Sequence, residues 1–237
     1  MKKILSCMRR AMQEYAMIEE NDVIAVGVSG GKDSLMLLYA LNLLKRFYPV
    51  KYTLQAIIVD LGFEGTDYSK IQKMCDDLEV PFHIVKTDIA QVVFEERKEK
   101  NPCALCSKMK KGALHDAILK LGINKLAFGH HADDAIETLF LSMLYEGRMH
   151  TFKPVTYLDR KQVTLIRPMI YIWEREIVYQ SNKLALPVMH KNCPADGESK
   201  REEVKQMILS MKKQIPKCEE RILNAIQNKE NFNLWFD

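Results

Sequence analysis

The segment Ser29–Ser34 has the residue types of a phosphate-binding loop, with the sequence Ser-Gly-Gly-Lys-Asp-Ser. Gly30 and Gly31 let the backbone approach an anion closely and adopt conformations that other residues avoid. Backbone amides at a helix start carry partial positive charge, and Lys32 and the serine hydroxyls add donors. A tight turn would explain a bare Gly-Gly pair, but the whole hexapeptide is more specific than that. It also differs from the longer G-x-x-x-x-G-K-[ST] loop.

A second polar segment contains a glycine, two histidines and two aspartates. Its sequence is Gly129-His130-His131-Ala132-Asp133-Asp134. Mg²⁺ prefers oxygen ligands and usually bridges one or two carboxylates to substrate phosphates, which favours Asp133 and Asp134 over the histidines. The histidines and carboxylates are also candidates for a general base. Alternatively, Asp133 is only a first-turn helix residue whose charge suits the helix dipole.

Cys103 and Cys106 form a C-x-x-C pair in a chain of six cysteines. Two thiolates at this spacing can bind one metal centre, because the turn between them brings both sulfurs to one side. A lone C-x-x-C pair could also be a redox dithiol or half of a zinc site. Three further cysteines lie on predicted helices, where they are more often packing residues: Cys7, Cys75 and Cys218.

Alternating apolar runs and amphipathic segments must position these residues. The predicted strands span 23–28, 54–59, 82–85 and 125–128, and the predicted helices span 1–20, 35–47, 69–78, 106–121 and 132–145. This alternation predicts an α/β fold with a doubly wound parallel sheet, whose ligands bind at the carboxyl ends of the strands. Both polar segments should therefore meet there. Asp60 also ends a predicted strand, where it would contact a nucleoside or merely close a turn.

The alternation breaks after residue 147. We expect one more strand at 164–168, helices at 174–183 and 200–214, and a loop at 187–197. A chain of 237 residues can bury one substantial core. We therefore expect three parts. They are an N-terminal helix at 1–20, a catalytic domain at 21–170 that includes the cysteine pair, and a C-terminal helical extension at 171–237.

Composition sets broad limits on the class of protein. A net charge of +4 is only mildly basic, but lysines and arginines gather in groups that could meet a phosphate backbone or simply be solvated helix faces. These groups are Lys108, Lys110 and Lys111; Lys200 and Arg201; and Lys212 and Lys213. The sequence shows neither a signal-peptide core nor an apolar run that would span a bilayer. We therefore expect a cytosolic protein without membrane contact, whose thiols stay reduced.

The motifs in combination resemble a known family. The hexapeptide at 29–34 matches the loop of the PP-loop ATP-pyrophosphatases. Within that group, the segment 129–140, which contains GHHADD and ends in Glu137-Thr138-Leu139-Phe140, is similar to TtcA-type tRNA 2-thiocytidine synthetases. The PCxLCxxxxxG pattern at 102–112 resembles their cluster-binding segment, and the resemblance extends from residue 17 at least to Arg167-Pro168.

This resemblance implies a Rossmann-type fold and a reaction with ATP. ATP would be cut between its α and β phosphates, the loop would grip pyrophosphate, and Asp33 would orient the loop or a magnesium ion. By the resemblance, the catalytic residues would be Lys32, Asp33, Asp133 and Asp134, with Mg²⁺ held by Asp133 or Asp134. The ATP contacts would be Ser29, Gly30, Gly31, Lys32, Asp33, Ser34, Asp60, Gly129 and His130.

The resemblance further implies a four-iron four-sulfur cluster held by three cysteines. Cys193 is the candidate third ligand beside Cys103 and Cys106, because it lies in the corresponding late loop and precedes a proline. Typical members carry a second C-x-x-C there, whereas this chain has Cys193-Pro194-Ala195-Asp196. The expected reaction is 2-thiolation of cytidine 32 in tRNA, with sulfur from a cysteine desulfurase or free sulfide. A homodimer is an open expectation.

Other functions remain open at this level. A PP-loop enzyme could thiolate another base, remove sulfur from one, or add an amine as lysidine-type ligases do, with the cysteines binding zinc or incidental. A regulator that binds ATP without turnover is an alternative from another class.

Overall fold

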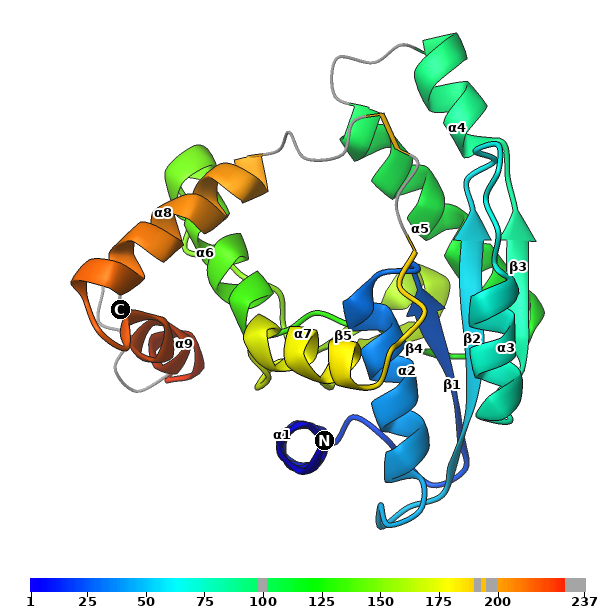
Figure 1. Ribbon diagram of the computed structural model, residues 1–237, viewed down its shortest axis with the longest axis horizontal. Coiled ribbons are helices and arrows are strands. Elements are labelled where there is room, and N and C mark those ends of the chain that lie inside the picture. The colour runs from blue at the N-terminus through cyan, green and yellow to red at the C-terminus, as the bar shows by residue number, and fades with distance from the viewer. Residues whose placement is uncertain (98–101, 190–192, 195–199, 229–237) are drawn as a thin grey trace.

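The computed structural model describes residues 1–97, 102–189, 193–194 and 200–228, and its centre is a six-stranded sheet (Figure 1). The strands are β1 (Asp22–Val28), β2 (Tyr52–Asp60), β3 (Phe82–Lys86), β4 (Lys125–Ala127), β5 (Val155–Leu158) and β6 (Val163–Ile166). Their order is β3-β2-β1-β4-β6-β5, and every neighbouring pair is parallel except β5 and β6. The predicted α/β sheet is confirmed, with one antiparallel edge strand that the sequence did not reveal.

Alternate residues of each strand face opposite sides of the sheet and build two cores. Ile24, Val26 and Val28 of β1 pack with α1 (Lys2–Glu14), α2 (Lys32–Leu44), α3 (Ser69–Asp77) and α7 (Glu174–Lys183). Ala25 of β1 faces the other core, with α4 (Ile89–Gln91), the π-helix η1 (Val92–Arg97) and α5 (Pro102–Lys120). Helices therefore cover both faces of the sheet, as the doubly wound class requires.

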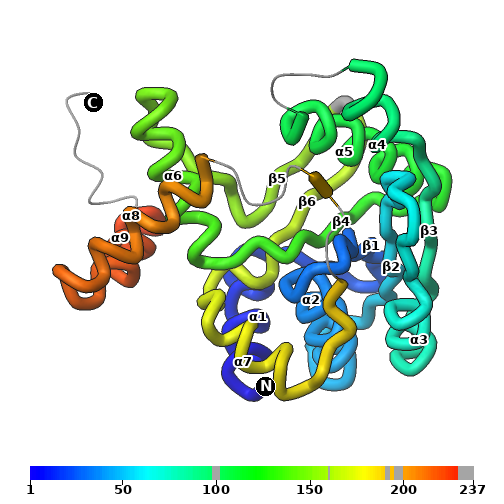
Figure 2. Tube along the Cα trace, turned by 45° about the horizontal axis from the view of Figure 1, so that its top comes forward, coloured from blue at the N-terminus to red at the C-terminus, as the bar shows by residue number. Residues whose placement is uncertain are grey.

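A third cluster joins α6 (Ala132–Glu146), α8 (Lys200–Gln214) and α9 (Cys218–Gln227). Its buried residues are Ile136, Val204 and Ile208. Both views show α8 and α9 beside α6, on the side of the molecule away from β2 and β3 (Figures 1 and 2). The described helices include none that is long and apolar enough to cross a membrane.

Several predicted helix ends are wrong, and each has a local reason. The first helix ends at Glu14 rather than Glu20, because Ala16 adopts a left-handed φ of 45° and Met17 turns back into the core. The helix predicted from 35 begins at Lys32, and the helix predicted from 106 begins at Pro102, a residue suited to a first helical position.

Smaller elements also differ from the prediction. The strand predicted at 164–168 spans Val163–Ile166, and α4, η1 and the 3-10 turn η2 (Asp159–Lys161) were not predicted. The helices predicted at 69–78, 132–145, 174–183 and 200–214 are confirmed to within a residue. Cys218 begins α9, whose bounds the sequence did not give. The predicted loop at 187–197 lies partly outside the described residues.

Candidate active site

The phosphate-binding loop joins the end of β1 to the start of α2. Gly30 has a left-handed φ of 78°, which favours glycine. Ser34 holds the loop closed: its Oγ accepts from the Ser29 amide at 3.0 Å and donates to the Gly31 carbonyl at 3.0 Å. Gly31 is the N-cap of α2, so the first amides of that helix open toward the loop. This arrangement suits an anion.

The second polar segment lies directly on the start of α2. A Cβ atom added to Gly129 would lie 2.9 Å from both the carbonyl carbon and oxygen of Asp33, and 3.1 Å from the Ser34 amide nitrogen. Only glycine permits this approach, which gives Gly129 a packing reason for its identity. Its predicted contact with ATP stays a prediction.

The two segments form the wall of one cavity of about 290 Å³ at the carboxyl ends of β1, β2 and β4. Its chemical groups come from both motifs and from α5: Ser29, Asp33, Ser34, Gly129, His130, Asp134 and Lys110. Val28, Ile57, Val59, Leu114 and Phe128 provide apolar walls. The structure therefore brings both motifs together. The volume of this cavity is close to the lower end of the range usual for small-molecule sites.

His130 is held as a neutral side chain in this cavity. Burial lowers its pKa to about 4, and Arg167 adds to this effect although Asp134 opposes it. Arg167 Nε donates to His130 Nδ1 at 3.2 Å, and the ring packs against Phe152 at 4.9 Å between centroids. Because Nδ1 accepts, the proton of the neutral ring belongs on Nε2. His130 is therefore better suited to donate a hydrogen bond than to bind a metal ion.

His131 lies between the carboxylates of the two motifs. Its Nε2 is 3.8 Å from Asp33 Oδ1 and 3.4 Å from Asp134 Oδ2. Burial alone would lower the pKa of His131, but a hydrogen bond that His131 donates to Asp133 and the charges of Asp134 and Asp33 raise it. The side chain also caps α6, since its Nδ1 accepts from the Asp134 amide at 3.4 Å.

Of the two carboxylates among the described residues of the cavity wall, Asp33 has the more exposed side chain. Within the described residues its Oδ1 is buried and has no hydrogen-bond partner, while Oδ2 accepts from Lys32 at 3.2 Å. Asp134 lines the same cavity and accepts from the His131 amide at 2.9 Å through Oδ2. An unpartnered buried carboxylate oxygen is costly unless a ligand satisfies it.

Asp133 and Asp60 occupy other surroundings. Neither is among the described residues that line the 290 Å³ cavity. Asp133 Oδ2 accepts from the Glu174 amide at 2.7 Å. Burial opposes ionisation of Asp133, but hydrogen bonds from His131 and the Glu174 amide lower its pKa. Asp60 Oδ1 accepts from the Gly62 amide at 3.0 Å and from Tyr68 at 3.1 Å, as a turn-closing aspartate would. Their predicted ligand contacts stay predictions.

Sequence reasoning missed a partner of the loop lysine. Lys32 Nζ lies 2.9 Å from Glu174 Oε1, at the first turn of α7. Burial works against the charge of Lys32, but Asp33 and Glu174 raise its pKa. Nothing in the spacing of Glu174 pairs it with a loop 142 residues earlier. It carried no sequence signal beyond being acidic at a helix start.

The late loop is attached to the phosphate-binding loop. The Met189 amide donates to the Gly30 carbonyl at 2.9 Å, and a Cβ on Gly30 would lie 3.1 Å from Met189 Sδ. Four residues later, Cys193 lines a cavity of about 160 Å³ together with Ser29, Lys110 and Met189. Cys193 therefore lies at the edge of a cavity that the phosphate-binding loop also lines.

Cys103 and Cys106 lie one helical turn apart on α5 rather than in a turn before it. Cys103 is exposed, whereas Cys106 and Cys193 are half-buried. Burial raises the pKa of Cys106, the nearby ammonium of Lys110 opposes this, and the thiols of Cys193 and Cys103 raise it further. Cys106 is therefore close enough to each of the other two thiols to feel its charge. Among the described residues, no three His, Cys, Asp or Glu side chains are arranged to hold a single metal ion.

The three lysines after the cysteine pair differ. Lys108 and Lys111 are exposed, but Lys110 is half-buried and lines both the 160 Å³ and the 290 Å³ cavities. Helical spacing explains this, because Cys103, Cys106 and Lys110 are separated by three and four residues and share one face of α5. Cys75 and Cys218 are buried and Cys7 packs against the main core, as expected of packing residues.

Comparison with known proteins agrees with this geometry. The family model described as PP-loop domain matches residues 4–211. The tRNA-cytidine(32) 2-sulfurtransferases of Pelobacter propionicus and Geobacter sulfurreducens are each 36% identical over 96% of this chain, which covers 86% and 90% of their lengths. The structure of the U34-tRNA thiolase NcsA from Methanococcus maripaludis with its [4Fe-4S] cluster is similar with a TM-score of 0.78 and 26% identity. That match covers 95% of this chain and 77% of NcsA.

Proposed function

This chain belongs to the PP-loop family and, within it, to the tRNA-cytidine(32) 2-sulfurtransferases, and we propose that it replaces the C2 oxygen of cytidine 32 in tRNA with sulfur at the expense of ATP. One observation carries the proposal. The cavity of the phosphate-binding loop and the cavity that contains Cys193 share Ser29 and Lys110. A base activated in the first cavity would lie beside a sulfur source in the second.

Activation would take place at the PP-loop. The C2 carbonyl oxygen of cytidine attacks the α-phosphorus of ATP, the bond from phosphorus to the bridging oxygen breaks, and pyrophosphate leaves. Lys32 and the first amides of α2 would bind that leaving group. His130, with its proton on Nε2, would donate a hydrogen bond to an oxygen of the nucleotide. Electrostatic stabilisation of this kind is usually a large part of catalysis.

Mg²⁺ fits the carboxylates of the cavity. The buried and unpartnered Oδ1 of Asp33 and the carboxylate of Asp134 would hold the ion, both on the cavity wall. When bound, Mg²⁺ would neutralise charge on the phosphates. Asp33 and Asp134 both line this cavity, whereas Asp133 is not among the described residues that do, which supports the first two as ligands.

A [4Fe-4S] cluster fits the three thiols by their chemistry. Cys103, Cys106 and Cys193 are free and at least partly accessible, the other two thiols both act on the pKa of Cys106, and thiolates are the usual ligands of such clusters. When bound, the cluster would hold the sulfur that is transferred. The thiols of Cys7, Cys75 and Cys218 lie on other elements and would not take part.

Sulfur transfer then completes the reaction. A hydrosulfide equivalent attacks C2 of the adenylated base, the bond between C2 and the AMP oxygen breaks, and the proton of the hydrosulfide is released. The products are 2-thiocytidine and AMP. Lys110 lines both cavities and would stabilise negative charge on the incoming sulfur and on the departing AMP. Either a cysteine desulfurase or free sulfide would supply the sulfur.

The test is a complete reaction with the full chain, purified without oxygen and reconstituted with iron and sulfide. It contains a tRNA transcript with C32, ATP, Mg²⁺ and sulfide, and nucleosides are identified by mass spectrometry. We expect 2-thiocytidine, with one AMP and one pyrophosphate per sulfur, and no product from a matched transcript with U32. Incorporation of an amine, or ATP binding without tRNA-dependent pyrophosphate release, would instead support a lysidine-type ligase or a regulator. Sulfur loss from a thiolated transcript would support desulfuration.

Cytosolic location is part of the proposal, because the required thiols stay reduced there. The oligomeric state, including a homodimer, stays a prediction.

A further inference from the structure

Glu174 connects the PP-loop to a helix that lies outside the nucleotide cavity. We propose that Glu174 is a positioning residue for Lys32 and that α8 acts on Lys32 through it. The inference rests on the proposed function in one respect, namely that Lys32 binds the pyrophosphate part of ATP. It adds a residue of α7 and a residue of α8 to the parts of the molecule on which ATP cleavage depends.

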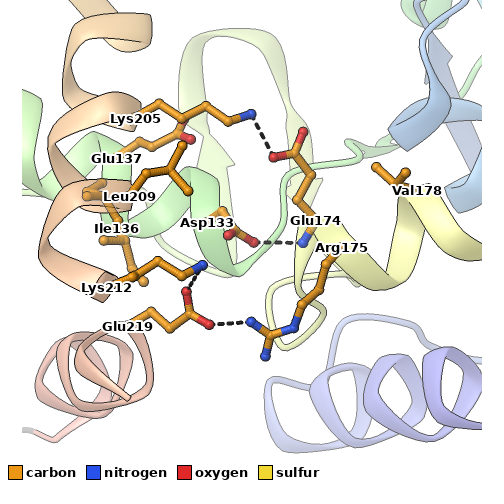
Figure 3. A pocket seen from close by; sticks show the side chains of 11 residues that line it. Asp133, Ile136, Glu137, Glu174, Arg175, Val178, Lys205, Leu209, Lys212 and Glu219 are labelled. Carbon is orange, nitrogen blue, oxygen red and sulfur yellow. Dashed lines mark hydrogen bonds and ion pairs between the residues drawn. The ribbon is translucent and has the colours of Figure 1, made fainter. Parts of the chain in front are cut away.

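Each oxygen of Glu174 binds one lysine (Figure 3 shows the second contact). Oε1 lies 2.9 Å from Lys32 Nζ, and Oε2 lies 2.7 Å from Lys205 Nζ of α8. The backbone at this point is fixed as well, because the Glu174 amide donates to Asp133 Oδ2 at 2.7 Å. These contacts lie at the edge of a cavity of about 420 Å³ between α6, α7, α8 and α9. Two ion pairs thus hold the carboxylate of Glu174, and one hydrogen bond holds its backbone.

This contact would matter because lysine is a flexible ligand. An ammonium group has three donors, and among the described residues the carboxylates of Glu174 and Asp33 take two of them. One donor then remains for a phosphate oxygen. Lysine loses side-chain entropy when it is fixed in one rotamer. A partner that fixes Lys32 before ATP binds therefore makes the loop preorganised for the leaving group.

Lys205 gives α8 a part in this arrangement. Its Nζ forms an ion pair with Glu174 Oε2 at 2.7 Å and so offsets charge on the second oxygen of the carboxylate. Without Lys205, Glu174 Oε2 would lose its ion-pair partner, and Lys32 alone would balance the charge of the carboxylate. We therefore expect Lys205 to affect ATP cleavage only through Glu174.

The first test compares Glu174→Ala with Glu174→Gln in the full reconstituted chain. Glu174→Ala should lower kcat for tRNA-dependent pyrophosphate release by about 10- to 100-fold with KM for ATP within about threefold, because it removes orientation of a group that acts in the transition state. Glu174→Gln keeps an acceptor for Lys32 and should therefore retain most of the wild-type activity that Glu174→Ala loses. Glu176→Ala is the matched control, since Glu176 lies two residues further on the same helix turn and pairs with Lys3.

A double-mutant cycle tests the role of α8. Lys205→Met should lower kcat about threefold, and Glu174→Ala with Lys205→Met should match Glu174→Ala within about twofold, because the residues act as one unit. Additive effects would overturn the part played by α8. An unchanged or raised kcat in Glu174→Ala, or an equal loss in Glu176→Ala, would overturn the positioning role.

A separate measurement distinguishes this inference from the proposed function. Binding of inorganic pyrophosphate with Mg²⁺ to each variant, measured by calorimetry without tRNA, should weaken in Glu174→Ala and stay unchanged in Glu176→Ala. If the wild-type chain makes no thionucleoside but shows this pattern, the proposed function fails and the positioning role stands. If the wild type is an active thiolase and pyrophosphate binding is the same in all variants, the positioning role fails alone.

Discussion

Lys110 lines both cavities, as Ser29 does, and we expect sulfur transfer to require its positive charge. Lys110→Met keeps the length of the side chain but removes the ammonium. We expect the rate of 2-thiocytidine formation to fall about 100-fold, the usual cost of one electrostatic stabiliser. Lys108→Met and Lys111→Met are matched controls on the same helix, because both side chains are exposed.

The comparison among these lysines also tests an earlier expectation. The sequence left open whether these lysines meet tRNA phosphates or form a solvated helix face, and it gave no reason to separate the three. If the three variants lose activity equally, and the loss is relieved at low salt, they form a phosphate-binding face and Lys110 has no special role. If only Lys110→Met is impaired, and at every salt concentration, the loss is explained by the position of Lys110 between the two cavities.

His130 makes the stability of the protein depend on pH in a defined direction. Its pKa in the folded protein is lowered to about 4 from the ordinary 6.5. Below pH 6.5 the unfolded chain binds a proton that the folded protein refuses, so the free energy of unfolding should fall as the pH falls. The effect should be complete near pH 4 and amount to about 3 kcal/mol.

Urea unfolding of the wild type and His130→Asn between pH 4 and 7 measures this contribution. The wild type should lose more stability than the variant as the solution is acidified. Parallel curves for the two proteins would show that His130 is not held neutral in the folded state.

At the scale of elements, the sequence predicted strands better than helix ends. The buried strands β1, β2 and β4 are short apolar runs, so their type and order could be predicted. Helix ends depend on single residues whose effect is conformational. Ala16 stops α1 by its left-handed φ although apolar residues continue, and Gly31 starts α2 before the apolar stretch begins. The edge strand β5 was missed because its residues are half-buried or exposed and show no clear alternation.

The candidate site shows the same division. Ser29–Ser34 and 129–134 were predictable because each follows a strand of a parallel sheet, and the carboxyl ends of such strands meet at one edge. Glu174 was not predictable, since only the packing of α7 against α2 brings it to Lys32. The difference between Asp133 and Asp134 could not be predicted either, because it depends on which side of α6 contacts α7.

At the scale of the whole molecule, one backbone contact joins the two halves of the proposed site. The Met189 amide donates to the Gly30 carbonyl, and Met189 and Cys193 line one cavity together with Ser29 of the phosphate-binding loop. These residues are far apart in the sequence, and no periodicity or motif would pair them. The third cysteine could therefore be proposed from the sequence only by resemblance, while this contact gives a physical reason for its position.

This contact predicts that a change in the phosphate-binding loop will alter the iron site. In Gly30→Ala the new Cβ would lie 3.1 Å from Met189 Sδ and would be strained at a φ of 78°. Either the loop or the Met189 segment must shift, so we expect weaker ATP binding and also less iron retained per chain after anaerobic reconstitution and desalting. Gly112→Ala is the matched control, because Gly112 lies on α5 near the cysteine pair and a Cβ there meets nothing within 4 Å. Iron and sulfide analysis, with the iron–sulfur absorbance, measures the effect without reference to activity. A Gly30→Ala protein that binds ATP poorly but keeps wild-type iron would show that the two sites are held independently, and that the Met189 contact does not position Cys193.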